Sequence, residues 1–244
     1  MKPHFVLAFL AFCIGLFACK SEASEDSSTV EASPMEDHPE MNAQLTSYLD
    51  SVVQSVPHLP AERIAQLDQI ATFVSQSAED DVTNLVFICT HNSRRSHMSQ
   101  LWAATAAAYY GVTSVHTFSG GTEATAFNPR AVAAMQRAGF SITNPGGTNP
   151  MYQVRWAADA DPMLCFSKRY DDVTIPYSNT VAVMTCSDAD KNCPLIPGVD
   201  LRVSLPFVDP KAADGTPAEA AAYDERAFQI ATEMTYLMQQ IAGA

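Results

Sequence analysis

A thiol, an arginine and several hydroxyl groups lie within one segment of eight residues. Cys89 ends the apolar run Leu85-Val-Phe-Ile-Cys89, and a polar segment follows it: Thr90, His91, Asn92, Ser93, Arg94, Arg95 and Ser96. In a loop between a buried strand and a helix, backbone N–H groups and the helix N-terminus attract an anion. The same field favours the thiolate form of a cysteine, which is the nucleophile. We therefore expect these residues to bind a tetrahedral oxyanion beside a nucleophilic sulfur.

The side chains of this segment suit oxyanion chemistry. Arg95 lies six residues after Cys89, so its planar guanidinium can return over the loop and hold two oxygens of the anion. Ser93 and Ser96 can donate hydrogen bonds to the sulfur or fix the loop, and the Asn92 amide can bridge the loop's ends. A cysteine at the end of a buried strand is often only a core residue. The neighbouring arginine and serines favour the chemical role.

Two further thiols, Cys186 and Cys193, enclose a polar, turn-prone segment. Such a pair can be a redox couple, a static disulfide or part of a metal site. Export from the cytoplasm would favour the static disulfide. Zinc is the weakest of the three, because the spacing is wide for a zinc knuckle and because His91 and His97 flank a different cysteine. We expect no metal, and we expect Cys165, which lies between two apolar residues, to be buried without a catalytic role.

Several motifs carry a resemblance to known families. The loop from Cys89 to Ser96 resembles the Cys-x5-Arg-Ser loop of the low-molecular-weight protein tyrosine phosphatase superfamily, and Val208-Asp209-Pro210 resembles its late Asp-Pro. The segments Ser119-Gly-Gly-Thr-Glu and Asn128-Pro-Arg are also similar to parts of that superfamily. The Cys186 to Cys193 segment resembles the Cys-x6-Cys redox loop of the thioredoxin-coupled arsenate reductases, which share the same fold. The resemblance covers residues 83–242 and implies a four-stranded parallel sheet.

The resemblance implies a relay of three thiols. Cys89 would attack arsenate held by the loop amides and Arg95, while Asp209 protonates the departing oxygen as general acid. Cys186 would then attack Cys89, with release of arsenite. Attack of Cys193 on Cys186 would move the disulfide to the segment between them, where an external thioredoxin-like dithiol reduces it. No bound cofactor is expected.

Two other functions are open. One is a phosphatase that cleaves a phosphate ester through a cysteinyl-phosphate on Cys89, with Arg95 and Asp209 in the same roles and the second cysteine pair as a structural disulfide. The other is a non-catalytic oxyanion-binding lipoprotein. His91 favours that reading, because it stands where the reductases usually have glycine, a difference that matters if the position needs a positive φ. Arg94, which replaces a small residue, either adds positive potential or points to solvent.

The pattern of the chain predicts the elements that hold these residues. Strands alternate with helices after residue 81, which indicates an α/β domain with a parallel sheet and helices on both faces. Strands are expected around residues 85–89, 114–119, 180–186 and 201–208, with a strand pair in 151–166 and a turn at Gly120-Gly121. Helices are expected from about residue 95 to Gly111, over 129–138 and over 217–242. Three-and-four spacing of apolar residues predicts two packing helices within 45–53 and 64–74.

The first part of the chain predicts export and a tether. Residues 1–18 read as a signal peptide, whose apolar run is too short for roughly 30 Å of hydrocarbon. Leu16-Phe17-Ala18-Cys19 resembles the lipobox of bacterial lipoproteins, which implies acylation of Cys19 and a membrane anchor. The alternative is an ordinary secretory signal that leaves Cys19 as a thiol.

The acidic composition limits the partners. Residues 19–42 contain seven acidic residues and one Lys and predict a disordered linker. A helical extension (43–80) and a phosphatase/arsenate reductase-like domain (81–244) follow. The formal net charge of -13 argues against binding to nucleic acid, whose phosphates repel such a protein. We therefore expect an exported, lipid-anchored enzyme on the periplasmic or cell-surface side of a membrane.

Overall fold

The computed structural model describes residues 40–78, 81–192 and 195–243, which belong to one compact unit. The expected signal peptide, nearly all of the acidic linker with Cys19, and Cys193 lie outside the described residues. Within those ranges, no helix is both long and apolar enough to cross a membrane.

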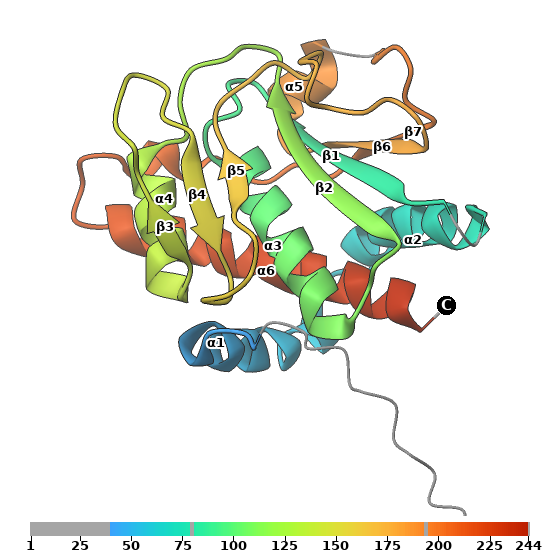
Figure 1. Ribbon diagram of the computed structural model, residues 1–244, viewed down its shortest axis with the longest axis horizontal. Coiled ribbons are helices and arrows are strands. Elements are labelled where there is room, and N and C mark those ends of the chain that lie inside the picture. Colours follow the sequence, from blue (N-terminus) through green and yellow to red (C-terminus); the bar gives the residue numbers. More distant parts are fainter. Residues whose placement is uncertain (1–39, 79–80, 193–194, 244) are drawn as a thin grey trace, which may run out of the picture. The chain divides into compact units, whose positions relative to one another are not determined.

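The central sheet has four parallel strands in the order β2-β1-β6-β7 (Figure 1). The strands are β1 Thr83–Cys89, β2 Val115–Gly121, β6 Thr180–Met184 and β7 Leu201–Ser204. All seven residues of β1 are buried, which explains its continuous apolar run, because a central parallel strand is covered on both faces. The predicted fold class is confirmed.

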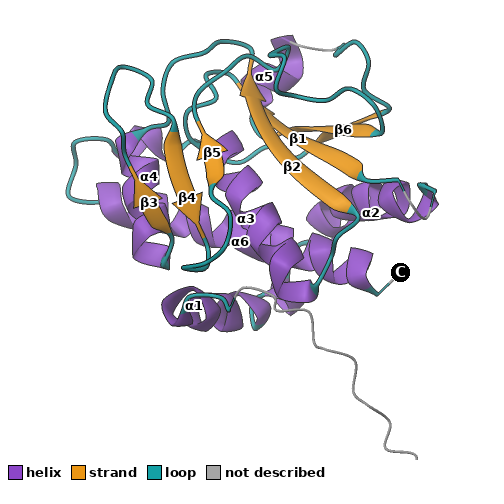
Figure 2. Ribbon diagram, viewed as in Figure 1, coloured by secondary structure: helices purple, strands orange, loops and turns teal. Residues whose placement is uncertain are grey.

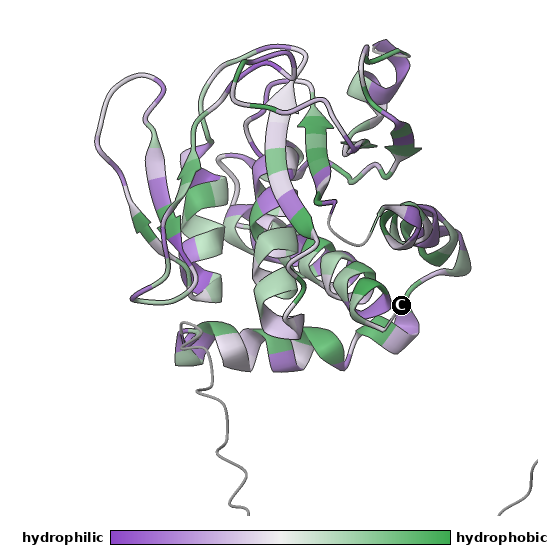
Figure 3. Cartoon of the chain, turned by 45° about the vertical axis from the view of Figure 1, so that its right-hand side comes forward, coloured by the Kyte–Doolittle hydropathy of each residue, from purple (hydrophilic) through white to green (hydrophobic). Residues whose placement is uncertain are grey.

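Helices cover both faces of this sheet, as predicted, but the helices on one face are long and the helix on the other is short (Figure 2). Leu85 and Phe87 of β1 pack into a core with side chains from three long helices. These helices are α3 Arg95–Tyr110, α4 Pro129–Ala138 and α6 Glu219–Ala242. On the other face, Val86 and Ile88 pack beneath the short helix α5, Ser187–Asn192, and loop residues such as Ile175. The long helices mix hydrophobic and hydrophilic residues along their length, as amphipathic helices do (Figure 3).

The prediction of a turn at Gly120-Gly121 is wrong, because both glycines are the last residues of β2. Gly121 pairs in register with Cys89 at the end of β1. A Cβ atom on Gly121 would lie 2.6 Å from the Asn92 nitrogen and 2.8 Å from the Thr90 carbonyl oxygen. The glycine is therefore needed for close packing against the thiol loop rather than for a change of chain direction.

A second, three-stranded antiparallel sheet lies beside α4 and α3 in the chain order β3-β4-β5 (Figure 1). Its strands are β3 Ser141–Thr143, β4 Tyr152–Arg155 and β5 Met163–Cys165. The predicted strand pair is confirmed as β4 and β5. Strand β3 was not predicted, because an alternation of only three residues cannot be told from a loop in the sequence.

The helices of the N-terminal extension pack as predicted. They are α1 Ala43–Val53, a 3-10 turn η1 Val56–His58, and α2 Ala61–Gln76. Leu49 of α1 and Ile70 of α2 are fully buried in the same core as α6. Burial of each such side chain stabilises the fold by about 1.5 to 3 kcal/mol.

Candidate active site

The carboxyl ends of the parallel strands bring three of the predicted site residues to one edge of the sheet. Cys89 ends β1, Cys186 follows β6, and Asp209 follows β7. The Thr185 N–H donates to the Ile88 carbonyl at 2.7 Å, so the segment after β6 stays against the end of β1. Ligands bind at this edge in open α/β sheets.

The loop after β1 is held by Asn92. Its backbone has a φ of 42°, a left-handed conformation in which asparagine is tolerated better than most residues. Its side-chain amide donates to Ser96 Oγ at 2.9 Å and its Oδ1 accepts from the Lys168 N–H at 2.9 Å. Asn92 thus joins one end of its loop, at Ser96, to the Lys168 segment rather than joining the two ends of the loop. His91 is not among the positive-φ residues of the described chain, so its replacement of a glycine does not strain the loop.

The Cys89 sulfur is buried and lies 3.1 Å from Ser96 Oγ. Because Ser96 Oγ already accepts a hydrogen bond from Asn92, its own proton is available for donation to the sulfur. Helix α3 begins at Arg95, so the sulfur also lies near the N-terminal end of a helix of sixteen residues. This environment suits a negatively charged sulfur.

Arg95 joins the loop to the segment that carries Asp209. Its Nη2 donates to Asp209 Oδ2 at 2.7 Å, and its Nη1 donates to the Phe207 carbonyl at 2.9 Å. Asp209 also caps the 3-10 turn η2, Pro210–Ala213, by accepting from the Lys211 N–H. Within the described part of the chain, Arg95 Nε is buried without a hydrogen-bond partner, so this N–H is available to an oxyanion. The predicted arginine and acid are thus brought together.

Arg94 does not point to solvent, which was one of its two expected positions. Its side chain is only 12% exposed, and its Nε lies 4.0 Å from Asp209 Oδ1. Its Nε donates to the Tyr223 hydroxyl at 2.8 Å, and its Nη2 lies 3.4 Å from Asp214 Oδ2. Tyr223 donates in turn to Asp214, and burial raises the pKa of Tyr223 to about 12. No local pattern in the sequence pointed to Tyr223 or Asp214, since they approach the loop only through the fold.

The remaining polar residues of the loop have structural contacts. Ser93 Oγ donates to the Ala126 carbonyl at 2.7 Å, so it fixes the loop rather than the sulfur. His97 is fully buried against Ser119, and burial, reinforced by Lys168, lowers the pKa of His97 to about 3. The imidazole is therefore neutral. Among the described residues, no group of three His, Cys, Asp or Glu side chains is arranged to hold a metal ion.

Cys186 lies beside the thiol loop. Its sulfur is 3.4 Å from the hydroxyl of Thr90, the residue after Cys89, and it accepts from the Ala189 N–H of α5. Cys186 is buried and carries a free thiol, as do Cys89 and Cys165. Cys165 is buried as predicted, and burial raises the pKa of its thiol to about 12. Arg202 of β7 forms an ion pair of 2.6 Å with Asp190 of α5, which holds α5 against β7.

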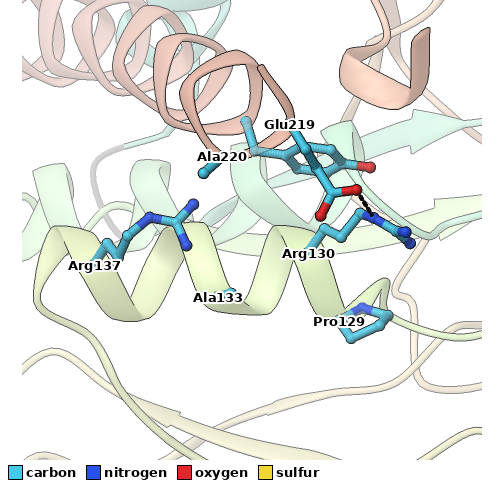
Figure 4. A pocket seen from close by; sticks show the side chains of 7 residues that line it. Pro129, Arg130, Ala133, Arg137, Glu219 and Ala220 are labelled. Atoms are coloured by element: carbon cyan, nitrogen blue, oxygen red, sulfur yellow. Dashed lines mark ion pairs between the residues drawn. The ribbon is translucent and has the colours of Figure 1, made fainter. Parts of the chain in front are cut away.

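A pocket of about 380 Å³ lies between α4 and α6 (Figure 4). Arg130 and Glu219 form an ion pair of 2.7 Å across it. Tyr223, which contacts Arg94, also lines this pocket. The pocket therefore adjoins the Arg94 network but is lined by different residues from the thiol loop.

Arsenate reductases are similar in sequence to this chain. Arsenate reductase 2 of Staphylococcus epidermidis is 31% identical over 130 residues, which are 53% of this chain and 80% of that protein. The arsenate reductase of Bacillus subtilis is 32% identical over 142 residues, which are 58% of this chain and 84% of that protein. No family model matches the sequence. The chain belongs to the arsenate reductase family.

Membership of the arsenate reductase family makes this protein an enzyme of the arsenate reductase or low-molecular-weight phosphatase type. Among solved structures, one titled an arsenate reductase in the phosphate binding state is similar with a TM-score of 0.43 and 16% identity, covering 66% of this chain and 99% of that one. A low-molecular-weight phosphotyrosine phosphatase from Vibrio cholerae has a TM-score of 0.44 and 13% identity, covering 64% of this chain and 95% of that one.

Proposed function

We propose that this protein reduces arsenate, with Cys89 as nucleophile and with Cys186 and Cys193 as the redox pair. The observation that carries the proposal is the place of the Cys186 sulfur, 3.4 Å from the hydroxyl of Thr90, which is adjacent to Cys89 in the chain. A phosphatase needs no second thiol at this position. A reductase does, because the second step is an attack on the first sulfur.

The first step forms a sulfur–arsenic bond. The oxyanion is held by the N–H groups of residues 90–96 and by Arg95, whose unpartnered Nε supports this role. The Cys89 thiolate attacks arsenic, and a hydroxyl of arsenate leaves as water after receiving the Asp209 proton. Asp209 stands at the start of η2 and is bonded to Arg95 at the start of α3, so this ion pair joins the segment of the acid to that of the anion-binding group.

The second step reduces arsenic. The Cys186 thiolate attacks Cys89, a disulfide forms, the sulfur–arsenic bond breaks, and its electron pair reduces arsenic from the +5 to the +3 state as arsenite leaves. Cys193 then attacks Cys186 and releases the Cys89 thiolate. An external dithiol of the thioredoxin type reduces the Cys186 to Cys193 disulfide, and no bound cofactor takes part.

A phosphatase reaction is the second candidate. Cys89, Arg95 and Asp209 form an arrangement that can cleave a phosphate ester through a cysteinyl-phosphate without any step at Cys186. The η2 turn after Asp209 carries Lys211-Ala-Ala rather than an aromatic pair, which argues against phosphotyrosine as the ester. The non-catalytic alternative has lost its main support, since His91 does not occupy a positive-φ position.

The variant Cys186→Ser separates the two reactions. We expect it to abolish arsenate reduction with a dithiol reductant while leaving the hydrolysis of p-nitrophenyl phosphate at the wild-type rate. Cys165→Ala is the matched control, because Cys165 is also a buried free thiol but lies on β5, and it should retain both activities. Arsenate reduction at the wild-type rate by Cys186→Ser would contradict the proposal, and a wild-type protein that only hydrolyses the ester would establish the phosphatase.

Mass spectrometry follows the relay directly. After arsenate is added without reductant, Cys186 and Cys193 should be recovered as a disulfide and should return to thiols when the dithiol is added. In Cys89→Ser the pair should stay reduced, because no sulfur–arsenic adduct forms. A Cys186 to Cys193 disulfide that never changes would identify that pair as structural.

We also propose that the enzyme is exported and tethered by a lipid. The support is the sequence: a signal-like segment at 1–18, Cys19 in a lipobox-like context and an acidic linker to residue 42, followed by the extension (43–80) and the catalytic domain (81–244). Two acyl chains anchor a protein stably where one does not. Labelled palmitate should enter the full chain but not Cys19→Ala, which should leave the membrane fraction. Unlabelled wild-type protein in the soluble fraction would refute the anchor.

A further inference from the structure

A buried carboxylate on α6 obtains its counter-charge from the N-terminal extension. Glu233 is only 1% exposed. Arg63 of α2 binds it with both arms of the guanidinium, with Nε donating to Oε1 at 3.0 Å and Nη2 donating to Oε2 at 2.5 Å. Gln229 donates to the same carboxylate at 3.0 Å. Because an unpaired buried carboxylate is costly, the ion pair between Arg63 and Glu233 stabilises the packing of α2 against α6.

The same arginine also holds the segment that leads from β7 to Asp209. Arg63 Nη1 donates to the Pro206 carbonyl at 3.1 Å. The centre of its guanidinium lies 4.8 Å from the centroid of the Phe207 ring, a cation-π contact. Arg63 therefore contacts Phe207 through its ring and through the carbonyl of the preceding residue, Pro206.

The carbonyl of Phe207 is one of the two groups that hold Arg95. Arg95 Nη1 donates to that carbonyl at 2.9 Å, and Arg95 Nη2 donates to Asp209, two residues further along the segment. A displacement of Phe207 would thus move both contacts of Arg95. A third guanidinium, on Arg226 of α6, lies in the same region, where burial together with Arg95 and Arg63 lowers the pKa of Arg226.

We propose that Arg63 is a positioning residue for the active site, acting through the Pro206 carbonyl and the Phe207 ring on Arg95. The N-terminal extension then helps to position the residues of the active site. This inference rests on the proposed role of Arg95 in binding the oxyanion. It assigns no chemistry to Arg63 itself, which touches neither Cys89 nor Asp209 in the contacts described above.

The variant Arg63→Lys tests positioning apart from stability. Lysine keeps a positive charge beside Glu233, but a single ammonium group cannot reproduce the fork that reaches both the carboxylate and Pro206. We expect its melting temperature to stay near the wild-type value, its affinity for inorganic phosphate in calorimetry to fall roughly tenfold, and kcat/KM to fall roughly ten- to a hundredfold. The loss should lie in kcat as well as KM, since Arg95 binds the anion throughout the reaction.

A double variant and a control complete the experiment. Arg63→Met with Glu233→Leu removes the ion pair without leaving a buried charge, so it restores packing but not the contact to Pro206. Its phosphate binding should stay as weak as that of Arg63→Lys. Arg137→Ala removes another arginine bound to α6, through an ion pair of 2.6 Å with Asp224, and should bind phosphate normally.

The outcomes are distinguishable. If the wild-type protein binds phosphate and Arg63→Lys binds it equally well, the inference is overturned and the proposed function stands. Recovery of wild-type binding in the double variant would also overturn it, because Arg63 would then act only on stability. A wild-type protein that binds no phosphate overturns the proposed function and this inference together.

Discussion

Replacement of Asn92 by alanine tests how the thiol loop is held. Asn92 is fully buried and makes two side-chain hydrogen bonds, to Ser96 Oγ and from the Lys168 N–H, both of 2.9 Å. Its backbone is left-handed, with a φ of 42°. Asn92→Ala removes both hydrogen bonds, and it places a side chain with no local hydrogen bond in a conformation that disfavours it.

The cost can be summed from these three effects. The lost bond to Ser96 costs about 1 kcal/mol, and the Lys168 N–H left without an acceptor costs about 1 to 3 kcal/mol. The left-handed conformation costs alanine about 1 kcal/mol. The free energy of unfolding should therefore fall by about 4 kcal/mol. Asn92→Gly loses the same bonds without the conformational cost, but glycine gains about 0.4 to 1 kcal/mol of entropy in the unfolded chain. The glycine variant should be the more stable of the two by at most about 0.6 kcal/mol.

Urea unfolding followed by tryptophan fluorescence measures these differences. Trp102 is fully buried and stacks on Tyr48 at 5.0 Å, so its emission reports loss of the core. An alanine variant within about 1 kcal/mol of the wild type would show that the two hydrogen bonds do not hold the loop. An alanine variant more stable than the glycine variant would show that position 92 is not left-handed in solution.

Three further predictions concern charge, anion binding and packing. The pKa of His97 is about 3 in the folded chain and 6.5 when unperturbed. Below about pH 6.5 the unfolded chain therefore binds a proton that the folded chain does not bind, and the free energy of unfolding should fall as the pH drops. Between pH 6.5 and 5.5 the wild type should lose about 1 kcal/mol more than His97→Gln in urea unfolding, and equal losses would contradict a buried neutral imidazole. Arg94→Ala should weaken phosphate binding less than about threefold in calorimetry, because the Arg94 guanidinium is bonded to Tyr223 and Asp214. Arg95→Ala should remove binding, because Arg95 Nε has no partner among the described residues, and equal effects would place Arg94 at the anion. Leu49→Ala should lower stability by about 2 to 5 kcal/mol and the exposed control Ser47→Ala by less than about 0.5 kcal/mol, while no difference would mean that the extension packs loosely.

The elements of the fold follow from local patterns. Strand β1 was predicted because a strand covered on both faces is apolar throughout. The structure shows that the limits of α4 are also set locally, since Asn128 caps its N-terminus, Pro129 starts it and Gly139 ends it in a left-handed conformation. These signals lie within a few residues of the structure they specify. Gly121 was misread because a glycine needed for close packing and a glycine needed for a turn look alike in a sequence.

The sequence by itself determined the chemical content of the site: a thiol loop with its arginine, a late acid and a second thiol, each at the carboxyl end of a predicted strand. The tertiary structure alone decided which of these side chains meet and what holds them. Arg95 reaches Asp209 across 114 positions, and Arg63 reaches Glu233 across 170. A hydrogen bond between such distant residues leaves no local pattern, because it depends on how whole helices and strands pack. For the same reason, the pairing of Arg94 with Tyr223 could be seen only in the folded chain.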